Sequence, residues 1–240
     1  MNSLYIREIR LKPSNIPHPW RDIFPIKLSN AITIIMGENG CGKSTLLESI
    51  AIKLGCNPEG GSKNFMFQTQ NTHSDLHNHL QISKGHLKEK DLYFYRAETF
   101  YNLNTEIRRL DEEKGYGPEI KSYYGGRDLH TVSHGEAMEA LFKHRFRSQG
   151  LYILDEPEAS LSPLRQLSFI QRITDLAQSG SQFLIATHSP ILMFTPGSEL
   201  LQILDGELVP VVAQETEAFS IYKAVLNTHG AYLKKMLGSP

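Results

Sequence analysis

The fold is decided by one stretch of the sequence, Ile32-Thr33-Ile34-Ile35-Met36-Gly37-Glu38-Asn39-Gly40-Cys41-Gly42-Lys43-Ser44-Thr45. Its first five residues form a mostly β-branched, apolar run, which is typical of a buried strand and which stops at Gly37. From Lys43 to Leu54, apolar residues recur at helical spacing until Gly55 ends the pattern. The sequence therefore predicts a strand, a glycine-rich turn and a helix in direct succession.

The glycine-rich turn, Gly37 to Ser44, matches the eight-position P-loop pattern in the context that this pattern requires. Glycines allow successive amide groups to curl around phosphates, and the following helix directs its positive end at them. We expect Lys43 to reach the β and γ phosphates and the Ser44 hydroxyl to bind Mg²⁺. Cys41 is interpreted as a small residue at a variable position rather than as a redox switch. The expected nucleotide contacts in this stretch are Glu38, Asn39, Gly40, Cys41, Gly42, Lys43, Ser44 and Thr45.

Two further apolar runs, 151–154 and 183–186, lack alternation and predict strands that are covered on both faces, as in a parallel sheet. Between them, residues 163–177 have helical periodicity, with Ser162 as the cap and Pro163 at the first helical position. A right-handed strand-helix-strand unit is the expected arrangement. One more strand is predicted at 91–96.

The predicted strand 151–154 ends in two carboxylates, Asp155 and Glu156, which places both at the carboxyl edge of the sheet beside the P-loop. We expect Asp155 to hold Mg²⁺ and Glu156 to polarise the water that attacks the γ-phosphate. The strand 183–186 ends in Thr187 and His188, and His188 is expected to donate to the γ-phosphate. Taken alone, the acid pair also suits a solvated turn and the histidine a structural strand end. The neighbouring P-loop favours the functional interpretation.

The segment Ser133-His134-Gly135-Glu136 predicts the start of another helix. Ser133 and Glu136 have the spacing of a capping box, and Met138, Leu141 and Phe142 would form the apolar face of that helix. Its amino end would offer N–H groups and a positive dipole to a phosphate. The plainer alternative is a helix cap with no further role.

Composition sets wider limits. A length of 240 residues suits one α/β core with a smaller lobe. The balance of 25 Lys and Arg against 26 Asp and Glu neither favours nor excludes nucleic-acid binding. The two cysteines are too few for a disulfide framework and lack zinc-site spacing, which fits a reducing cytosol. Residues 1–11 do not resemble a secretory signal, and no apolar run approaches the roughly 20 residues of a membrane span, so we expect a cytoplasmic protein without direct membrane insertion.

Five motifs in a fixed order carry a resemblance to the ABC ATPase superfamily. They are the P-loop, Ser133 to Glu136, Leu154 to Pro157, Ala159 to Ser162, and Thr187 to Pro190. The resemblance implies an ATPase that uses ATP and Mg²⁺, with a mainly parallel sheet flanked by helices and a smaller helical lobe. It also implies that Asp155 and Glu156 are the Walker B pair, that residues 159–162 are the D-loop, and that His188 is the switch histidine.

Residues 133–136 are similar to the signature of that superfamily, which is usually Leu-Ser-Gly-Gly followed by Gln or Glu. Here Val132 replaces the leucine and His134 the first glycine. In this superfamily the signature acts on the ATP held by a second subunit. The resemblance therefore implies a homodimer that encloses two ATP molecules, with Ser133, Gly135 and Glu136 at the partner's nucleotide.

Glu136, and the lack of the Gln-Arg run that often follows in transporters, make the chain similar to the chromosome-maintenance and repair branch. The small stand-alone bacterial predicted ATPases of that branch share a Tyr-Arg-Ala-Glu segment, here Tyr95 to Glu98. That resemblance implies a regulatory ATPase with an unidentified protein partner, a nuclease or another effector, acting on nucleic acid or in defence against phage. The rival interpretation is the nucleotide-binding subunit of a membrane transporter, and a third is an ATP sensor that barely turns ATP over.

We expect one ABC-type ATPase domain over residues 1–240. Its nucleotide-binding core is predicted at 1–68 and 150–214, its helical lobe at 69–149, and a helical tail packed on the core at 215–240.

Four weaker signals complete the sequence analysis. Gln68, in preference to Gln70, is expected to sense Mg²⁺ and to couple the core to the helical lobe. The histidines at 73, 77 and 79 are interpreted as a polar loop rather than a zinc site. Residues 123–127, Tyr-Tyr-Gly-Gly-Arg, suit base stacking or a turn equally well. Trp20 and Arg21 are candidates for stacking on adenine.

Overall fold

The computed structural model describes residues 4–13, 20–62, 74–112, 119–126 and 131–238. Within them, seven strands form one mixed sheet in the order β10-β9-β3-β8-β7-β6-β4. The five inner strands are parallel, and β10 and β4 run antiparallel at the two edges. The strands are β3 (Ile32–Gly37), β4 (Gly61–Ser62), β6 (Asp91–Arg96), β7 (Gly150–Asp155), β8 (Gln182–Ala186), β9 (Glu199–Leu204) and β10 (Glu207–Pro210).

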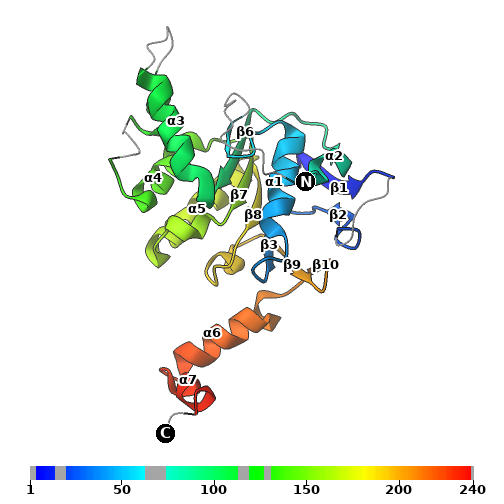
Figure 1. Cartoon of the computed structure of the whole chain (residues 1–240), viewed down its shortest axis with the longest axis vertical. Coiled ribbons are helices and arrows are strands. Elements are labelled where there is room, and N and C mark those ends of the chain that lie inside the picture. Colours follow the sequence, from blue (N-terminus) through cyan, green and yellow to red (C-terminus); the bar gives the residue numbers. More distant parts are fainter. Residues whose placement is uncertain (1–3, 14–19, 63–73, 113–118, 127–130, 239–240) are drawn as a thin grey trace.

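Helices cover both faces of this sheet (Figure 1). The helix α1 (Lys43–Leu54) contacts β7 and β8 on one face, and α5 (Pro163–Gln178) contacts β8. Every residue of β7 and β8 is buried, as the absence of alternation in their sequences predicts. The predicted mainly parallel α/β fold is confirmed.

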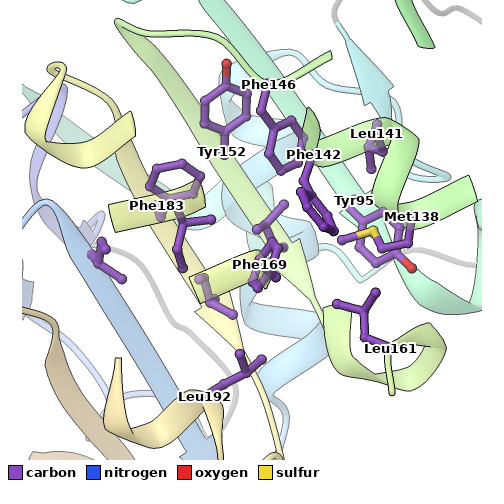
Figure 2. Close-up of a cluster of buried hydrophobic side chains, with 14 of the residues drawn as sticks. Tyr95, Met138, Leu141, Phe142, Phe146, Tyr152, Leu161, Phe169, Phe183 and Leu192 are labelled. Atoms are coloured by element: carbon purple, nitrogen blue, oxygen red, sulfur yellow. The ribbon is translucent and has the colours of Figure 1, made fainter. Parts of the chain in front are cut away.

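Aromatic side chains fill the core on the α5 face (Figure 2). The Tyr152 ring in β7 lies 5.1 Å from the ring of Phe183 and 4.4 Å from that of Phe146, measured between centroids. Phe142 meets Phe169 of α5 edge-on at 5.5 Å. Since Phe142 and Phe146 come from the helical lobe, the lobe shares one core with the sheet and α5.

A second sheet, which the sequence analysis did not foresee, contributes to the core on the α1 face. It is antiparallel, with the order β2-β1-β5, and comprises β1 (Ile6–Leu11), β2 (Ile26–Lys27) and β5 (Leu80–Lys84). Its apolar side chains join those of α1 in one buried cluster, and the short helix α2 (Leu76–His79) lies beside α1. The side chain of Gln182 in β8 accepts hydrogen bonds from the backbone of Tyr5 and Ile6 and donates one to the Ile6 carbonyl, so it ties the two sheets together.

The helical lobe follows β6 directly. It contains a 3₁₀ turn (Ala97–Thr99), α3 (Phe100–Glu112), a second 3₁₀ turn (Ile120–Tyr124), α4 (His134–Ala140) and a single π turn (Leu141–Arg145). The stretch 69–149, assigned to the lobe from sequence, also contains β5 and β6, which belong to the sheets. Those two strands are not part of the helical lobe, because β5 pairs with β1 and β6 with β7.

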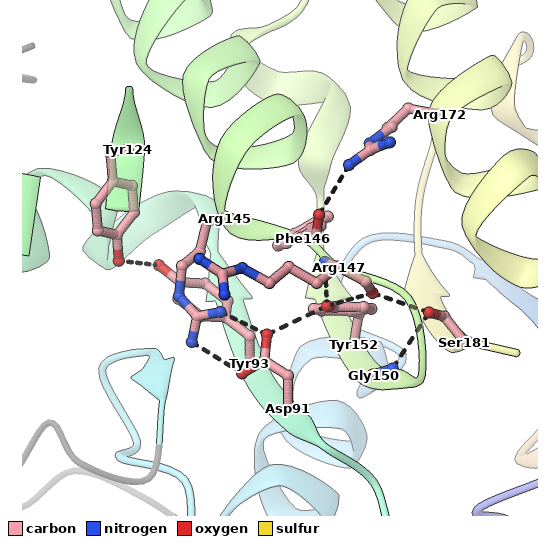
Figure 3. A network of polar contacts seen from close by, with 10 residues as sticks. All are labelled: Asp91, Tyr93, Tyr124, Arg145, Phe146, Arg147, Gly150, Tyr152, Arg172 and Ser181. Carbon is pink, nitrogen blue, oxygen red and sulfur yellow. Dashed lines mark hydrogen bonds and ion pairs between the residues drawn. The ribbon is translucent and has the colours of Figure 1, made fainter. Parts of the chain in front are cut away.

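A polar network anchors the last turn of the lobe to the amino end of β6 (Figure 3). The Arg145 guanidinium donates to both carboxylate oxygens of Asp91, at 2.5 and 2.9 Å, and the Tyr152 hydroxyl donates to the same carboxylate at 3.2 Å. Arg172 of α5 donates to the backbone carbonyls of Phe142 and Phe146. The free carbonyls at the end of this helical segment are thereby satisfied.

The tail forms two short helices, α6 (Glu217–Asn227) and α7 (Ala231–Met236). The expectation that it packs on the core is wrong beyond its first turn. Of the described residues of the two helices, only Ala218 and Phe219 pack against the core, and the Phe219 ring lies 5.7 Å from that of Phe194. Figure 1 shows both helices lying away from the sheets. An amphipathic pattern predicts that a helix has an apolar face, but it does not say what that face meets.

No helix of the described residues is long and apolar enough to cross a membrane.

Candidate nucleotide-binding site

The P-loop connects β3 to α1 and is shaped by glycines in left-handed conformations. Gly40 has φ 79°, and Gly42, which caps α1, has φ 100°. A side chain is disfavoured at both values. The Lys43 side chain is buried, and its ammonium donates to the carbonyls of Gly37 and Glu38, both at 2.9 Å. The loop therefore curls around its own lysine, beside the amino end of α1.

Ser44 and Asp155 meet at the carboxyl edge of the sheet. The Ser44 hydroxyl donates to Asp155 Oδ1 at 3.0 Å. This contact crosses from the start of α1 to the end of β7, and β8 lies between β3 and β7 in the sheet. The structure thus brings together the two residues that the sequence analysis assigned to Mg²⁺.

Asp155 lies in a buried environment in which the charge of Arg96 only partly offsets the cost of an ionised carboxylate. It is 3% exposed, and burial raises the pKa of its carboxyl to about 6, with a smaller contribution from Glu156. The hydrogen bond from Ser44 and the charge of Arg96 act in the opposite direction, but Arg96 Nε is 3.9 Å from Asp155 Oδ2. A buried carboxylate of this kind gains from a bound cation.

Glu156 and His188 lie next to each other at the same edge. Glu156 Oε1 is 3.7 Å from His188 Nε2, and 40% of the Glu156 side chain is exposed. Glu156 has φ 51° and ψ 53°, a left-handed conformation that is costly for a residue other than glycine. Its amide donates to the Ala186 carbonyl, which continues the β7–β8 ladder and fixes the turn. The arrangement leaves one carboxylate able to accept a proton from a water molecule at this edge.

Arg96 is a residue of this region that the sequence analysis did not assign. It ends β6, where the ladder pairs it with Asp155. Its guanidinium donates to Glu48 of α1 at 2.8 Å and to Glu98 at 3.1 Å. The sequence predicted the strand at 91–96 but not that it pairs with β7, and only this pairing brings Arg96 to the edge of the acid pair.

The segment 133–136 forms the predicted capping box. The Glu136 amide donates to Ser133 Oγ at 3.3 Å, and the Ser133 amide donates to Glu136 Oε2 at 2.9 Å. Gly135 packs against the turn that follows β7, where a Cβ atom would lie 2.8 Å from the Ser160 carbonyl oxygen. Met138, Leu141 and Phe142 are buried, as predicted.

The remaining candidates are only partly described. Gln68, Gln70, His73 and Arg127 lie outside the described residues. His77 Nδ1 is 2.9 Å from the Ser74 carbonyl oxygen. Tyr124 is buried and its hydroxyl lies 3.4 Å from that of Tyr93, so Tyr124 does not present its ring for stacking. The Trp20 ring lies against the P-loop, at 2.6 Å from the position of a Cβ on Gly42.

A strand, a glycine-rich loop and a helix, with a serine at the loop end bonded to a strand-end aspartate, define a P-loop nucleotide-binding protein. Comparison with protein families gives the finer assignment. A family model described as "ABC transporter" matches residues 28–159, more than half of the chain, and one described as "AAA domain, putative AbiEii toxin, Type IV TA system" matches residues 140–193. The chain belongs to the ABC ATPase superfamily, and it is an ATPase that binds and hydrolyses ATP.

Curated relatives include transporter proteins. A probable branched-chain amino acid transport ATP-binding protein, LivF, of Archaeoglobus fulgidus is 30% identical over 144 residues, which are 56% of this chain and 59% of that protein. The ABC transporter G family member STR2 of Medicago truncatula is 23% identical over 90% of this chain and 30% of its own length. The chain therefore spans less than two thirds of these relatives.

Solved structures share the fold. The chain MJ1267, described as an ATP-binding cassette of an ABC transporter, superposes with a TM-score of 0.54 at 16% identity. The match covers 92% of this chain and 99% of that one.

Proposed function

We propose that the residues at the carboxyl edge of the seven-stranded sheet hydrolyse ATP, each in the role that the sequence analysis assigned to it. The observation that carries this proposal is the Ser44–Asp155 hydrogen bond, which joins the phosphate-binding loop to the acid pair. Lys43 binds the β and γ phosphates, and Glu156 accepts a proton from the attacking water. His188 donates to the γ-phosphate. The expected phosphate contacts from residues 38 to 45 follow from the amides and side chains of the P-loop.

Ser44 and Asp155 are the residues that would hold Mg²⁺. The fit rests on Asp155, whose buried carboxylate has a raised pKa and lies beside a hydroxyl that can also act as a ligand. Oxygen ligands of this kind suit Mg²⁺. When bound, Mg²⁺ would neutralise charge on the phosphates. A contribution of Gln68 to the same ion stays a prediction.

We further propose that two copies enclose two ATP molecules. ABC ATPases bind ATP and dimerise, and the capped start of α4 leaves an amino end that can serve the partner's γ-phosphate. Ser133, Gly135 and Glu136 have this role. Trp20, which lies against Gly42, is the candidate for stacking on adenine.

The chain is proposed to serve as the ATP-binding subunit of a membrane transporter. The family match and the curated relatives support this reading over a regulatory ATPase, which the sequence analysis had favoured. In this reading the domain of residues 1–240 works at the cytoplasmic face of a membrane partner.

A second candidate function rests on the family match over residues 140–193. The description of that family names a putative toxin of a toxin-antitoxin system. It is the regulatory ATPase of the chromosome-maintenance and repair branch, with a nuclease or another effector as partner and nucleic acid as a target.

The test is the variant Glu156→Gln, purified with a tag. We expect its ATPase rate to fall about 100-fold or more, because the proton acceptor is lost, and the protein to elute as a dimer with MgATP in light-scattering chromatography. Glu112→Gln, an exposed carboxylate on α3, is the control and should keep the wild-type rate. A Glu156→Gln protein that hydrolyses ATP at the wild-type rate would overturn the assignment.

The same variant separates the two partner classes. Recovery of a membrane-spanning protein with the MgATP-bound dimer from the membrane fraction supports the transporter function. Recovery of a nuclease from the soluble fraction supports the second candidate.

A further inference from the structure

Glu158 connects the two residues of the proposed hydrolytic pair. It lies in the 3₁₀ turn Pro157–Ser160, two residues after Glu156. Its carboxylate oxygen Oε1 accepts a hydrogen bond from the backbone amide of His188 at 2.6 Å. One side chain thus joins the turn that follows β7 to the segment that follows β8.

His188 needs such a partner, because its backbone has left the sheet. The Thr187 amide donates to the Ile35 carbonyl, but the ladder between β7 and β8 ends at Ala186. The His188 amide is part-buried and takes a side-chain acceptor in place of a strand partner. The acceptor is a charged side chain, and charge-assisted hydrogen bonds are stronger than neutral ones.

The second oxygen of Glu158 has a different environment. Within the described part of the chain, Oε2 is buried and has no hydrogen-bond partner. Tyr95 of β6, itself buried, lies close enough for the Glu158 charge to raise the pKa of its hydroxyl, although burial is the larger cause. Holding a carboxylate in this place is costly, so packing alone does not account for a glutamate here.

We propose that Glu158 is a positioning residue for ATP hydrolysis, which holds His188 at its place beside Glu156. The inference rests on the proposed roles of Glu156 and His188. In this role Glu158 acts through His188 rather than on the nucleotide: it fixes the backbone that carries the imidazole from the 3₁₀ turn Pro157–Ser160, one residue before the proposed D-loop. The 3.7 Å distance between Glu156 Oε1 and His188 Nε2 therefore depends on Glu158.

The experiment compares Glu158→Ala, Glu158→Gln and Glu158→Asp in steady-state ATPase assays of the full chain. We expect Glu158→Ala to lower kcat by about 10- to 100-fold, with KM for ATP within about threefold of the wild-type value, since misplacement affects the chemical step. Glu158→Gln keeps an acceptor oxygen at the same distance from the backbone, so its kcat should lie much closer to the wild-type value than that of Glu158→Ala. Glu158→Asp is one methylene too short and should resemble the alanine variant.

A double-mutant cycle with His188→Ala separates positioning from general stability. If Glu158 acts through His188, then adding Glu158→Ala to His188→Ala causes no further loss of kcat. Additive losses, or a wild-type kcat in either single alanine variant, would overturn the inference. Thermal unfolding of each variant shows whether the fold is retained, and Glu158→Gln keeps the comparison informative if the alanine variant is unstable.

The proposed function is tested separately by Glu156→Gln. An inactive Glu156→Gln together with a fully active Glu158→Ala rejects the role of Glu158 and leaves the proposed hydrolysis standing. A fully active Glu156→Gln rejects the hydrolytic roles themselves.

Discussion

Arg96 lies among three carboxylates, those of Glu48, Glu98 and Asp155. Two of the three are buried, and the guanidinium is 21% exposed. The arrangement joins α1, β6 and the acid pair at one point. Removing one partner of a buried ion pair leaves the other charge buried without compensation. This usually lowers the free energy of unfolding more than replacing both partners by apolar residues does.

We therefore predict that Arg96→Leu lowers the free energy of unfolding by about 3 kcal/mol. The measurement is urea denaturation without nucleotide. The matched control is Arg108→Leu, which breaks the exposed pair with Glu112 and should cost about 1 kcal/mol or less. Equal effects of the two substitutions would contradict the electrostatic explanation.

The raised pKa of Asp155 leads to a pH-dependent prediction. Burial raises the pKa of its carboxyl to about 6 in the folded chain, above the ordinary value of 3.8, so the folded state binds the proton more tightly than the unfolded state does. Stability is lost as the pH rises from about 4 to 6, and above pH 6 the ionised group costs about 2 to 3 kcal/mol. Asp155→Asn should therefore unfold at a higher temperature than wild type at pH 8, with a smaller difference at pH 4, although we expect its ATPase activity to be lost.

Melting curves across this pH range, without nucleotide or Mg²⁺, make the comparison. Asp22→Asn, at an exposed position, serves as the control and should show no such trend. A lower melting temperature for Asp155→Asn at pH 8 would show that the carboxylate is compensated in the free protein.

Among the elements, α4 illustrates how a glycine can be required without an unusual backbone. A Cβ on Gly135 would lie 2.8 Å from the Ser160 carbonyl oxygen and 2.5 Å from Arg165 Nη1. The arginine can move, but the carbonyl belongs to the turn that carries Glu158. We predict that Gly135→Ala destabilises the chain by about 1 to 3 kcal/mol, although alanine is the better helix former by about 1 kcal/mol. Denaturation at equilibrium measures the sign directly.

Whether a helix or strand could be predicted depends on how far apart in the sequence its interacting residues lie. β3, α1, β7, β8 and α5 carry local signals, namely apolar runs, a cap and glycines, and the sequence analysis placed all of them. The antiparallel sheet of β1, β2 and β5 was missed, because its pairing joins residues 6–11 with residues 80–84 and no turn signal connects them. Short strands with such distant partners have little local pattern to detect.

The same limit applies within the site. The acid pair and the P-loop could be predicted, because each lies at the end of a strand with a clear pattern. Arg96 and Glu158 could not be assigned roles without the strand order and the side-chain directions. Gln68 was chosen from an adjacent apolar run, and its position lies outside the described residues.

At the scale of the whole molecule, the tail contributes little to the core. No residue of α6 or α7 is buried, and the exposed apolar side chains include Ile221, Leu226 and Leu233. We predict that a chain ending at Ser220, which keeps Phe219, unfolds within about 1 kcal/mol of the full chain. Chemical denaturation of both chains tests this, and a truncated chain that fails to fold would show that the tail is part of the domain.

The ion pair between Arg145 and Asp91 has a mechanical consequence. It fixes the final turn of the lobe at the base of β6, whereas Ser133 lies at the opposite end of the same helical segment. A segment of 12 residues is about 18 Å long, so a tilt of roughly 10° about that anchor would carry its free end by about 3 Å. That distance is comparable to one hydrogen bond, so a small tilt about this anchor is enough to make or break the proposed contact between Ser133 and the triphosphate of a second subunit.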